Sequence, residues 1–175
     1  AASDVYKRQG RATDEGVTFG ALSGADQVTT VQKLVDDALT QGATVASGGV
    51  LPTGLPAGGS YFPATVLTNV PTTADIAHSE IFGPVVAIQT FATEDEGIAM
   101  ANDTPFGLAA YVFAGDTGRA LTIAERIEAG MVAINKGTIS DPAAPFGGVK
   151  ESGVGREGGM EGIGEYLEPK YISLP

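Results

Sequence analysis

The stretch from Val85 to Asn135, VVAIQTFATEDEGIAMANDTPFGLAAYVFAGDTGRALTIAERIEAGMVAIN, alternates between short apolar runs and segments with helical spacing. Three runs are predicted to be strands: Val85–Phe91, Ala109–Ala114 and Met131–Asn135. Thr93 and Glu96 have the spacing of a capping box, and Asp116 stands at an N-cap position, so a helix is predicted after each of the first two strands. Short links between strand and helix favour right-handed crossovers, and hence an α/β fold with a mostly parallel sheet and flanking helices.

An amphipathic helix is predicted before this stretch, from Leu22 to Thr40. Its apolar side chains recur at three- and four-residue steps and form one stripe: Val28, Val31, Leu34, Val35, Ala38 and Leu39. Ser23 with Asp26 gives a start signal for this helix. The sequence then predicts a short strand, an exposed loop and an extended run: Ala43–Ser47, Gly48–Ser60 and Tyr61–Val70.

Glycine dominates the chain after the α/β stretch. Residues 147–164 contain eight glycines in 18 positions, too many for a continuous helix or strand, so irregular backbone is predicted. Tyr166–Leu174 regains β propensity, and Pro169 within it suits an edge strand. Because such a strand is separate from the βαβ segment, we expect it to pair with another chain.

The composition limits the possible functions. The 175 residues are 43% hydrophobic and 18% charged, as in a globular domain with a core. A net charge of −11 argues against nucleic acid as a partner, because phosphate binding needs clustered Lys and Arg. No apolar run reaches the roughly 18 residues of a membrane span, and no signal peptide is recognised, so a cytoplasmic location is expected. With no Cys and one His, no disulfide and no metal site is predicted.

Two sequence matches are misleading. Gly153–Gly158 fits the GxGxxG pattern of dinucleotide-binding loops, but that loop must follow a strand and open a helix, and neither flank has such a pattern. His78 is the single imidazole, and the chain has no GxSxG turn that would present a nucleophilic serine to it. We therefore interpret His78 as a surface or second-layer residue rather than as part of a hydrolase site.

The loop Glu80-Ile81-Phe82-Gly83-Pro84 leads into an apolar strand. Spacing alone is equally compatible with an ordinary turn that buries one aromatic ring. The segment EIFGPV at 80–85 resembles a signature of the NAD(P)-dependent aldehyde dehydrogenases. The resemblance extends from Gly10 to Leu174. Four further segments resemble segments of that family and occur in the same order: Asn102–Leu108, Met131–Asn135, Pro145–Gly148 and Ser152–Gly158.

The resemblance implies roles for four residues. Glu80 would accept hydrogen bonds from the nicotinamide ribose hydroxyls of NAD or NADP, since a carboxylate can accept from both. Phe82 would pack near the nicotinamide ring. SDPAAPFGG, at Ser140–Gly148, and EGIGEYLEPKYI further resemble succinate-semialdehyde dehydrogenases. In that subgroup Ser140 would help to hold the distal carboxylate of the substrate, and Phe146 would form an apolar wall of the aldehyde pocket.

The family resemblance also implies chemistry that these residues do not carry. A cysteine thiolate attacks the aldehyde, and a glutamate activates water, yet the chain has no cysteine and no matching base. We therefore assign no catalytic residue and expect the chain alone to be inactive. The expected organisation is a non-native stretch at 1–9, a partial catalytic domain at 10–164 and an oligomerisation strand at 165–175, within a dimeric or tetrameric parent enzyme that oxidises succinate semialdehyde or a related semialdehyde.

Three alternatives stay open at this point. The chain could be a non-catalytic module that assembles with dehydrogenase subunits, a free-standing α/β domain that binds a nucleotide, or part of an aldehyde dehydrogenase with another substrate preference. NAD and NADP are not distinguished, because the family reads the ribose 2′ position with residues upstream of those present.

Overall fold

The fold is that of a computed structural model, which describes residues 8–175. The chain divides into two compact units, residues 1–92 and residues 93–175. Most of the stretch predicted to be non-native, residues 1–9, lies outside the described residues. Among those described, no helix has the length and apolar character needed to cross a membrane.

The last two residues of that stretch take part in the first unit. Gln9 is 7% exposed, and its side-chain amide donates to the carbonyl oxygen of Phe62 at 2.8 Å. The backbone N–H of Arg8 donates to Oγ1 of Thr18 at 2.8 Å. The non-native origin of residues 1–9 remains a prediction.

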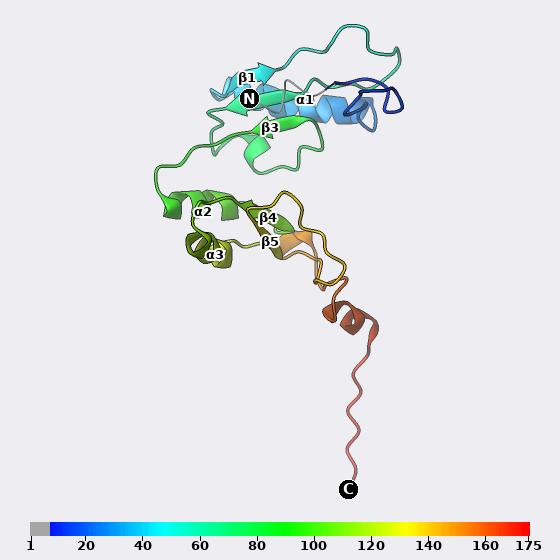
Figure 1. The fold of residues 1–175 in the computed structure, drawn as a ribbon, viewed down its shortest axis with the longest axis vertical. Helices are drawn as coiled ribbons and strands as arrows, with labels where there is room; N and C mark the ends of the chain where they lie inside the picture. Colours follow the sequence, from blue (N-terminus) through cyan, green and yellow to red (C-terminus); the bar gives the residue numbers. More distant parts are fainter. Residues whose placement is uncertain (1–7) are drawn as a thin grey trace. The chain divides into compact units, whose positions relative to one another are not determined.

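The first unit packs helix α1 (Ala25–Thr40) against a three-stranded sheet (Figure 1). The strands lie in chain order, with β1 antiparallel to β2 and β2 parallel to β3: β1 (Thr44–Gly48), β2 (Thr65–Thr68) and β3 (Val85–Ala87). Val31 and Val35, one turn apart on α1, are buried with Leu67 of β2 and Val85 of β3. The core therefore lies between one face of α1 and the sheet.

The apolar stripe predicted for the first helix is largely confirmed, but its start is not. The helix begins at Ala25, after Gly24 at the N-cap, and no side chain caps it. Ser23 is thus not the capping residue, because the turn that enters the helix places glycine at that position. Leu39, at the end of the stripe, is 37% exposed.

The second unit contains a parallel βαβ segment. Strand β4 (Ala109–Val112) pairs in parallel with β5 (Met131–Ile134), and helix α3 (Thr117–Arg126) connects them. Helix α2 (Glu94–Asn102) precedes β4 (Figure 1). This arrangement is an α/β fold, as the alternation in the sequence predicts.

Both predicted N-caps of the second unit are confirmed. Oγ1 of Thr93 accepts from the N–H of Glu96 at 3.2 Å and caps α2. Oδ1 of Asp116 accepts from the N–H of Arg119 at 2.7 Å and caps α3. Within α3, the Leu121 side chain is 52% exposed.

Ion pairs join α2 to α3. Arg119 contacts Glu94 at 2.6 Å, and Arg126 contacts Asp95 at 2.6 Å. Because the side chains of both pairs are partly or largely exposed to solvent, each pair contributes only modestly to stability.

The strands form two sheets, where the alternation alone suggests one. Strand β3 pairs with β2, and β4 pairs with β5. Strand β3 is only three residues long, and each of its residues has its partner on β2. Two of the three strand pairs are parallel, so the mostly parallel character is confirmed.

The glycine-rich segment is irregular apart from two short 3₁₀ helices, η2 (Lys150–Ser152) and η3 (Glu161–Tyr166). Residues 167–175 follow η3 as an extended trace that belongs to no helix or strand (Figure 1). The strand predicted for Tyr166–Leu174 is therefore absent within the described chain. A strand requires a hydrogen-bonded neighbour, and the described residues supply none for this segment.

Candidate functional site

The loop Glu80–Gly83 lies in the connection between β2 and β3. Glu80 is exposed, and the Phe82 side chain is 71% exposed. Phe82 has φ of 47°, in the left-handed region that residues with a Cβ rarely adopt. The Phe82 ring therefore does not have the buried position that the ordinary-turn interpretation expected.

Helix α1 contacts this loop through two of its side chains. A Cβ on Gly83 would lie 2.7 Å from Cγ2 of Val31, so the close approach of loop and helix requires glycine there. The side-chain amide nitrogen of Gln27 donates to the carbonyl oxygen of Ile81 at 3.0 Å and to that of Phe82 at 3.3 Å. One turn of α1 thus contacts three consecutive residues of the loop.

The same helix holds the other end of the connection. The 3₁₀ helix η1 (Asp75–Ala77) begins where the N–H of Asp75 donates to Oδ2 of Asp37 at 2.9 Å. The Gln41 amide also donates to the Asp37 carboxylate at 2.9 Å. The Gln41 hydrogen bond and then that of Asp75 lower the pKa of Asp37, against a smaller opposing effect of burial.

His78 follows η1 at its C-cap. Its Nε2 lies 2.6 Å from the carbonyl oxygen of Thr72, and the residue is partly exposed. This is the surface or second-layer setting predicted from the sequence.

An exposed carboxylate and an exposed aromatic ring on one braced loop suit a flat polar ligand. The carboxylate of Glu80 is available to accept hydrogen bonds from paired hydroxyls, and the ring of Phe82 offers a face for stacking. These two groups fit the nicotinamide riboside half of a dinucleotide, because that half presents a ribose diol and a planar ring.

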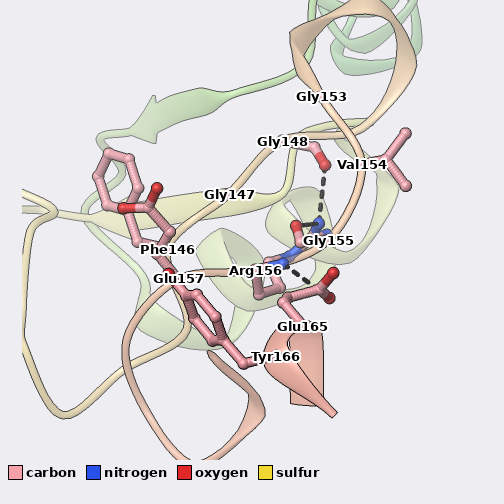
Figure 2. A pocket seen from close by; sticks show the side chains of 10 residues that line it. All are labelled: Phe146, Gly147, Gly148, Gly153, Val154, Gly155, Arg156, Glu157, Glu165 and Tyr166. Carbon is pink, nitrogen blue, oxygen red and sulfur yellow. Dashed lines mark hydrogen bonds between the residues drawn. The ribbon is translucent and has the colours of Figure 1, made fainter. Parts of the chain in front are cut away.

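The second unit contains a cavity of about 410 Å³ (Figure 2). Its lining comes from the glycine-rich segment and η3: Phe146–Gly148, Gly153–Glu157, Glu165 and Tyr166. Phe146 is 37% exposed and forms an antiparallel bridge with Glu157, in which their backbone groups exchange hydrogen bonds of 2.6 and 2.7 Å.

Arg156 organises the backbone around this cavity. Its Nη1 donates to the carbonyl oxygens of Gly148 at 2.8 Å and Gly155 at 2.7 Å. The backbone N–H of Arg156 donates to Oε1 of Glu165 at 3.4 Å. Figure 2 shows the Arg156 side chain between Gly148 and Glu165. Gly155 has φ of 80°, and a Cβ there would meet the Glu165 carboxylate at 2.6 Å.

The four residues predicted as site residues divide between the two units. Glu80 and Phe82 lie together on the loop of the first unit. Phe146 lines the cavity of the second unit, whereas Ser140 is exposed and is not among the residues that line it. Ser140 therefore does not line the cavity that Phe146 lines.

The GxGxxG match at Gly153–Gly158 is accidental, as predicted. The 3₁₀ helix η2 precedes it in place of a strand, and η3 follows it in place of an α-helix. The phosphate site of a dinucleotide loop needs the N-terminus of an α-helix, which this segment does not provide.

Three contacts that organise the second unit were not predicted. The N–H of Gly107 donates to Oγ of Ser152 at 2.9 Å. Lys150 has φ of 54°. Its Nζ donates to the carbonyl oxygen of Asn102, at the end of α2, over 2.7 Å, and it forms an ion pair of 2.7 Å with Glu128. All three contacts join segments that are distant in sequence, so local pattern carries little signal for them.

Gln27 was also missed, although a weak signal exists. It stands four residues before Val31, on the face of α1 that meets the loop. Its place beside the apolar stripe is the signal that puts it near the loop.

Comparison with known proteins gives one consistent family. Residues 2–172 match the aldehyde dehydrogenase family. The chain is 46% identical over 174 residues to a glutarate-semialdehyde dehydrogenase of Pseudomonas putida, covering 99% of this chain and 35% of that protein. It is 45% identical over 165 residues to succinate-semialdehyde dehydrogenase [NADP(+)] GabD of Escherichia coli, covering 94% and 34%.

Solved structures agree with the sequence relatives. An aldehyde dehydrogenase of Mycobacterium tuberculosis complexed with NAD+ superposes with a TM-score of 0.90 at 37% identity, covering 98% of this chain and 35% of that one. The chain thus spans about 35% of the length of the proteins that it resembles. With the family match across nearly all its residues, the chain belongs to the aldehyde dehydrogenase family of oxidoreductases.

Proposed function

We propose that this chain is part of an NAD(P)-dependent dehydrogenase that oxidises succinate semialdehyde, or a related semialdehyde such as glutarate semialdehyde, to the carboxylic acid. The observation that carries the proposal is that Glu80 and Phe82 are both exposed on one loop, Glu80–Gly83, which helix α1 contacts. The names of the Pseudomonas putida and Escherichia coli relatives support the substrate class.

The loop of the first unit binds the nicotinamide half of the cofactor. Glu80 accepts hydrogen bonds from the ribose hydroxyls, and Phe82 orients the nicotinamide ring by packing on it. When bound, the dinucleotide would supply the hydride acceptor, so that aldehyde, water and NAD(P)+ would give carboxylate, NAD(P)H and two protons. Both cofactors occur among the relatives, NADP(+) in the name of the Escherichia coli enzyme and NAD+ in the Mycobacterium tuberculosis structure.

The second unit contributes to substrate binding. The hydroxyl of Ser140 donates to the distal carboxylate of the substrate, a charge-assisted hydrogen bond that an uncharged aldehyde cannot form. Phe146 supplies an apolar wall. The exposure of Ser140 supports this role, because an accessible hydroxyl is needed for it.

The chain acts as a partial catalytic domain. The family resemblance implies a cysteine thiolate as nucleophile, and these 175 residues contain no cysteine. We propose that residues 10–164 act together with a segment that carries the thiolate, and that the chain alone is inactive. Residues 165–175, in which Tyr166 is 86% and Tyr171 is 89% exposed, pair as a strand with a neighbouring subunit.

A chimeric enzyme, called the joined enzyme below, tests this proposal. In it, residues 10–175 replace the matching region of the Escherichia coli relative, and the sequence of that relative before this region is kept. We expect kcat/KM for succinate and glutarate semialdehydes to exceed that for butanal and pentanal, and Ser140→Ala to reduce only the former. Equal use of the uncharged aldehydes, or an equal effect of Ser140→Ala on all four, would contradict the substrate assignment.

A further inference from the structure

We propose that Gln27 is a positioning residue that fixes the backbone of the loop Glu80–Gly83 and thereby sets the placement of the nicotinamide ring. The inference rests on the proposed cofactor role of that loop. Gln27 is given no contact with cofactor or substrate, and it acts through the backbone of Ile81 and Phe82.

The geometry matches the donors of a primary amide. The Gln27 side-chain nitrogen carries two N–H groups, and it faces two successive carbonyl oxygens, those of Ile81 at 3.0 Å and Phe82 at 3.3 Å. Successive carbonyls of an extended chain point in opposite directions, so one donor group can reach both only if the backbone turns between them. The turn is present as the left-handed conformation of Phe82, with φ of 47°.

That conformation needs external support. A residue with a Cβ persists in the left-handed region only where its surroundings determine it. Two features of α1 provide support, namely the contact of Val31 with Gly83 and the amide of Gln27. The first is apolar and fixes how close the loop lies, whereas the second is directional and fixes how the peptide planes are turned.

The Phe82 ring has little other constraint. It is 71% exposed, so packing contributes little to its direction. Since the ring and the carbonyl of Phe82 share one Cα, a change in the backbone at this residue redirects the ring. We therefore infer that loss of the Gln27 donors misplaces Phe82 and, with it, the neighbouring Glu80.

The first test uses proteolysis of the whole 175-residue chain and needs no cofactor. Thermolysin cleavage on the amino side of Ile81 or Phe82 reports local opening of the loop, with cleavage before the 70%-exposed Ile172 as an internal reference. In Gln27→Met, which keeps the length and removes the donors, we expect cleavage at the loop to be about three- to tenfold faster, the equivalent of one lost hydrogen bond.

Two further variants make this test specific. Gln27→Lys retains donor groups and should cleave like the unsubstituted chain. Gln32→Met removes an amide on the same helix that donates to Asp36 at 2.8 Å, and it should leave the loop unaffected. An unchanged rate in Gln27→Met would overturn the inference. So would an equal increase before the buried Leu67, because Gln27 would then support the whole unit.

The second test measures the cofactor role in the joined enzyme. We expect Gln27→Met to lower kcat several-fold and to raise KM for NAD(P), with KM for the semialdehyde unchanged. Gln27→Lys, which retains donor groups, should have the kinetic constants of the unsubstituted joined enzyme. If Glu80→Gln impairs cofactor use and Gln27→Met does not, the inference fails and the proposed function stands. If neither variant impairs it, the proposed cofactor role of the loop fails, whatever the proteolysis shows.

Discussion

The side-chain oxygen of Ser152 accepts a hydrogen bond of 2.9 Å from the backbone N–H of Gly107, across 45 residues of sequence. Gly107 is buried, and its carbonyl oxygen accepts from the N–H groups of Gly130 and Val149, each at 2.9 Å. A Cβ at this position would lie 2.7 Å from the Glu128 carbonyl oxygen. Gly107 therefore joins the segments before β4 and before β5 to the glycine-rich segment.

Ser152→Ala is predicted to destabilise the second unit. The substitution leaves the buried N–H of Gly107 without its acceptor, at a cost of about 1 to 3 kcal/mol. Urea unfolding followed by circular dichroism measures the change. Ser173→Ala, in the exposed tail, is the matched control and should have no effect. Equal stabilities of the two variants would show that the contact contributes nothing.

The stability of the first unit is predicted to depend on the charge of Asp37. Hydrogen bonds from Gln41 and Asp75 lower the pKa of this carboxyl below its ordinary value of 3.8. The folded state thus binds the proton more weakly than the unfolded state. The contribution of Asp37 to the stability of the folded state is therefore present above the ordinary pKa. It is lost as the pH falls through the lower pKa that Asp37 has in the folded state.

Asp37→Asn isolates this contribution. We expect the variant to have a lower Tm than the unsubstituted chain at pH 7, and the difference to shrink below about pH 4. Asp36→Asn, on the same helix, is the control, since that carboxylate bonds Gln32 within the helix. A difference in Tm that stays constant across the acid range would exclude the charge as its cause.

The strands and helices were predictable where local pattern determines them. Thr93 and Asp116 cap the helices that they were expected to cap, because an N-cap depends on the residue itself and its next three neighbours. Which strands pair was not predictable in the same way. The pairing of β3 with β2 places Val85 beside Thr65, and the N–H of Thr65 donates to the carbonyl oxygen of Pro84 at 2.9 Å. These residues are distant in sequence.

The candidate site shows the same division. EIFGPV marks the loop, and the resemblance gives roles for Glu80 and Phe82, but the sequence does not reveal that the ring is exposed on left-handed backbone. That geometry comes from α1, through Gln27 and Val31, some 50 residues earlier in the chain. Tertiary contacts of this kind leave no local signature.

Glu80→Gln in the joined enzyme is predicted to weaken cofactor placement more than folding. Loss of a charged acceptor for the ribose hydroxyls costs roughly 1.5 to 3 kcal/mol. Because Glu80 is exposed, the Tm without cofactor should not change. Steady-state kinetics with varied NAD(P), beside thermal unfolding, measures both, and Glu15→Gln is an exposed control. A large loss of Tm with normal kinetics would make Glu80 a structural residue.

The isolated chain is predicted to self-associate through residues 165–175. This segment exposes Tyr166, Tyr171 and Leu174, each more than 80% accessible, on backbone that has no strand partner in the described chain. Light scattering should detect oligomers or aggregates, and deletion of residues 165–175 should reduce them. A monodisperse monomer, with or without the tail, would contradict the oligomerisation role.

The most direct test of the proposed function compares the chain alone with the joined enzyme. Both are incubated with succinate semialdehyde and NAD or NADP, and the absorbance of the reduced cofactor is followed. We predict no turnover above background for the chain alone, because it contains no thiol nucleophile, and clear NAD(P)H formation by the joined enzyme. Turnover by the chain alone, or an inactive but correctly folded joined enzyme, would contradict the proposed function.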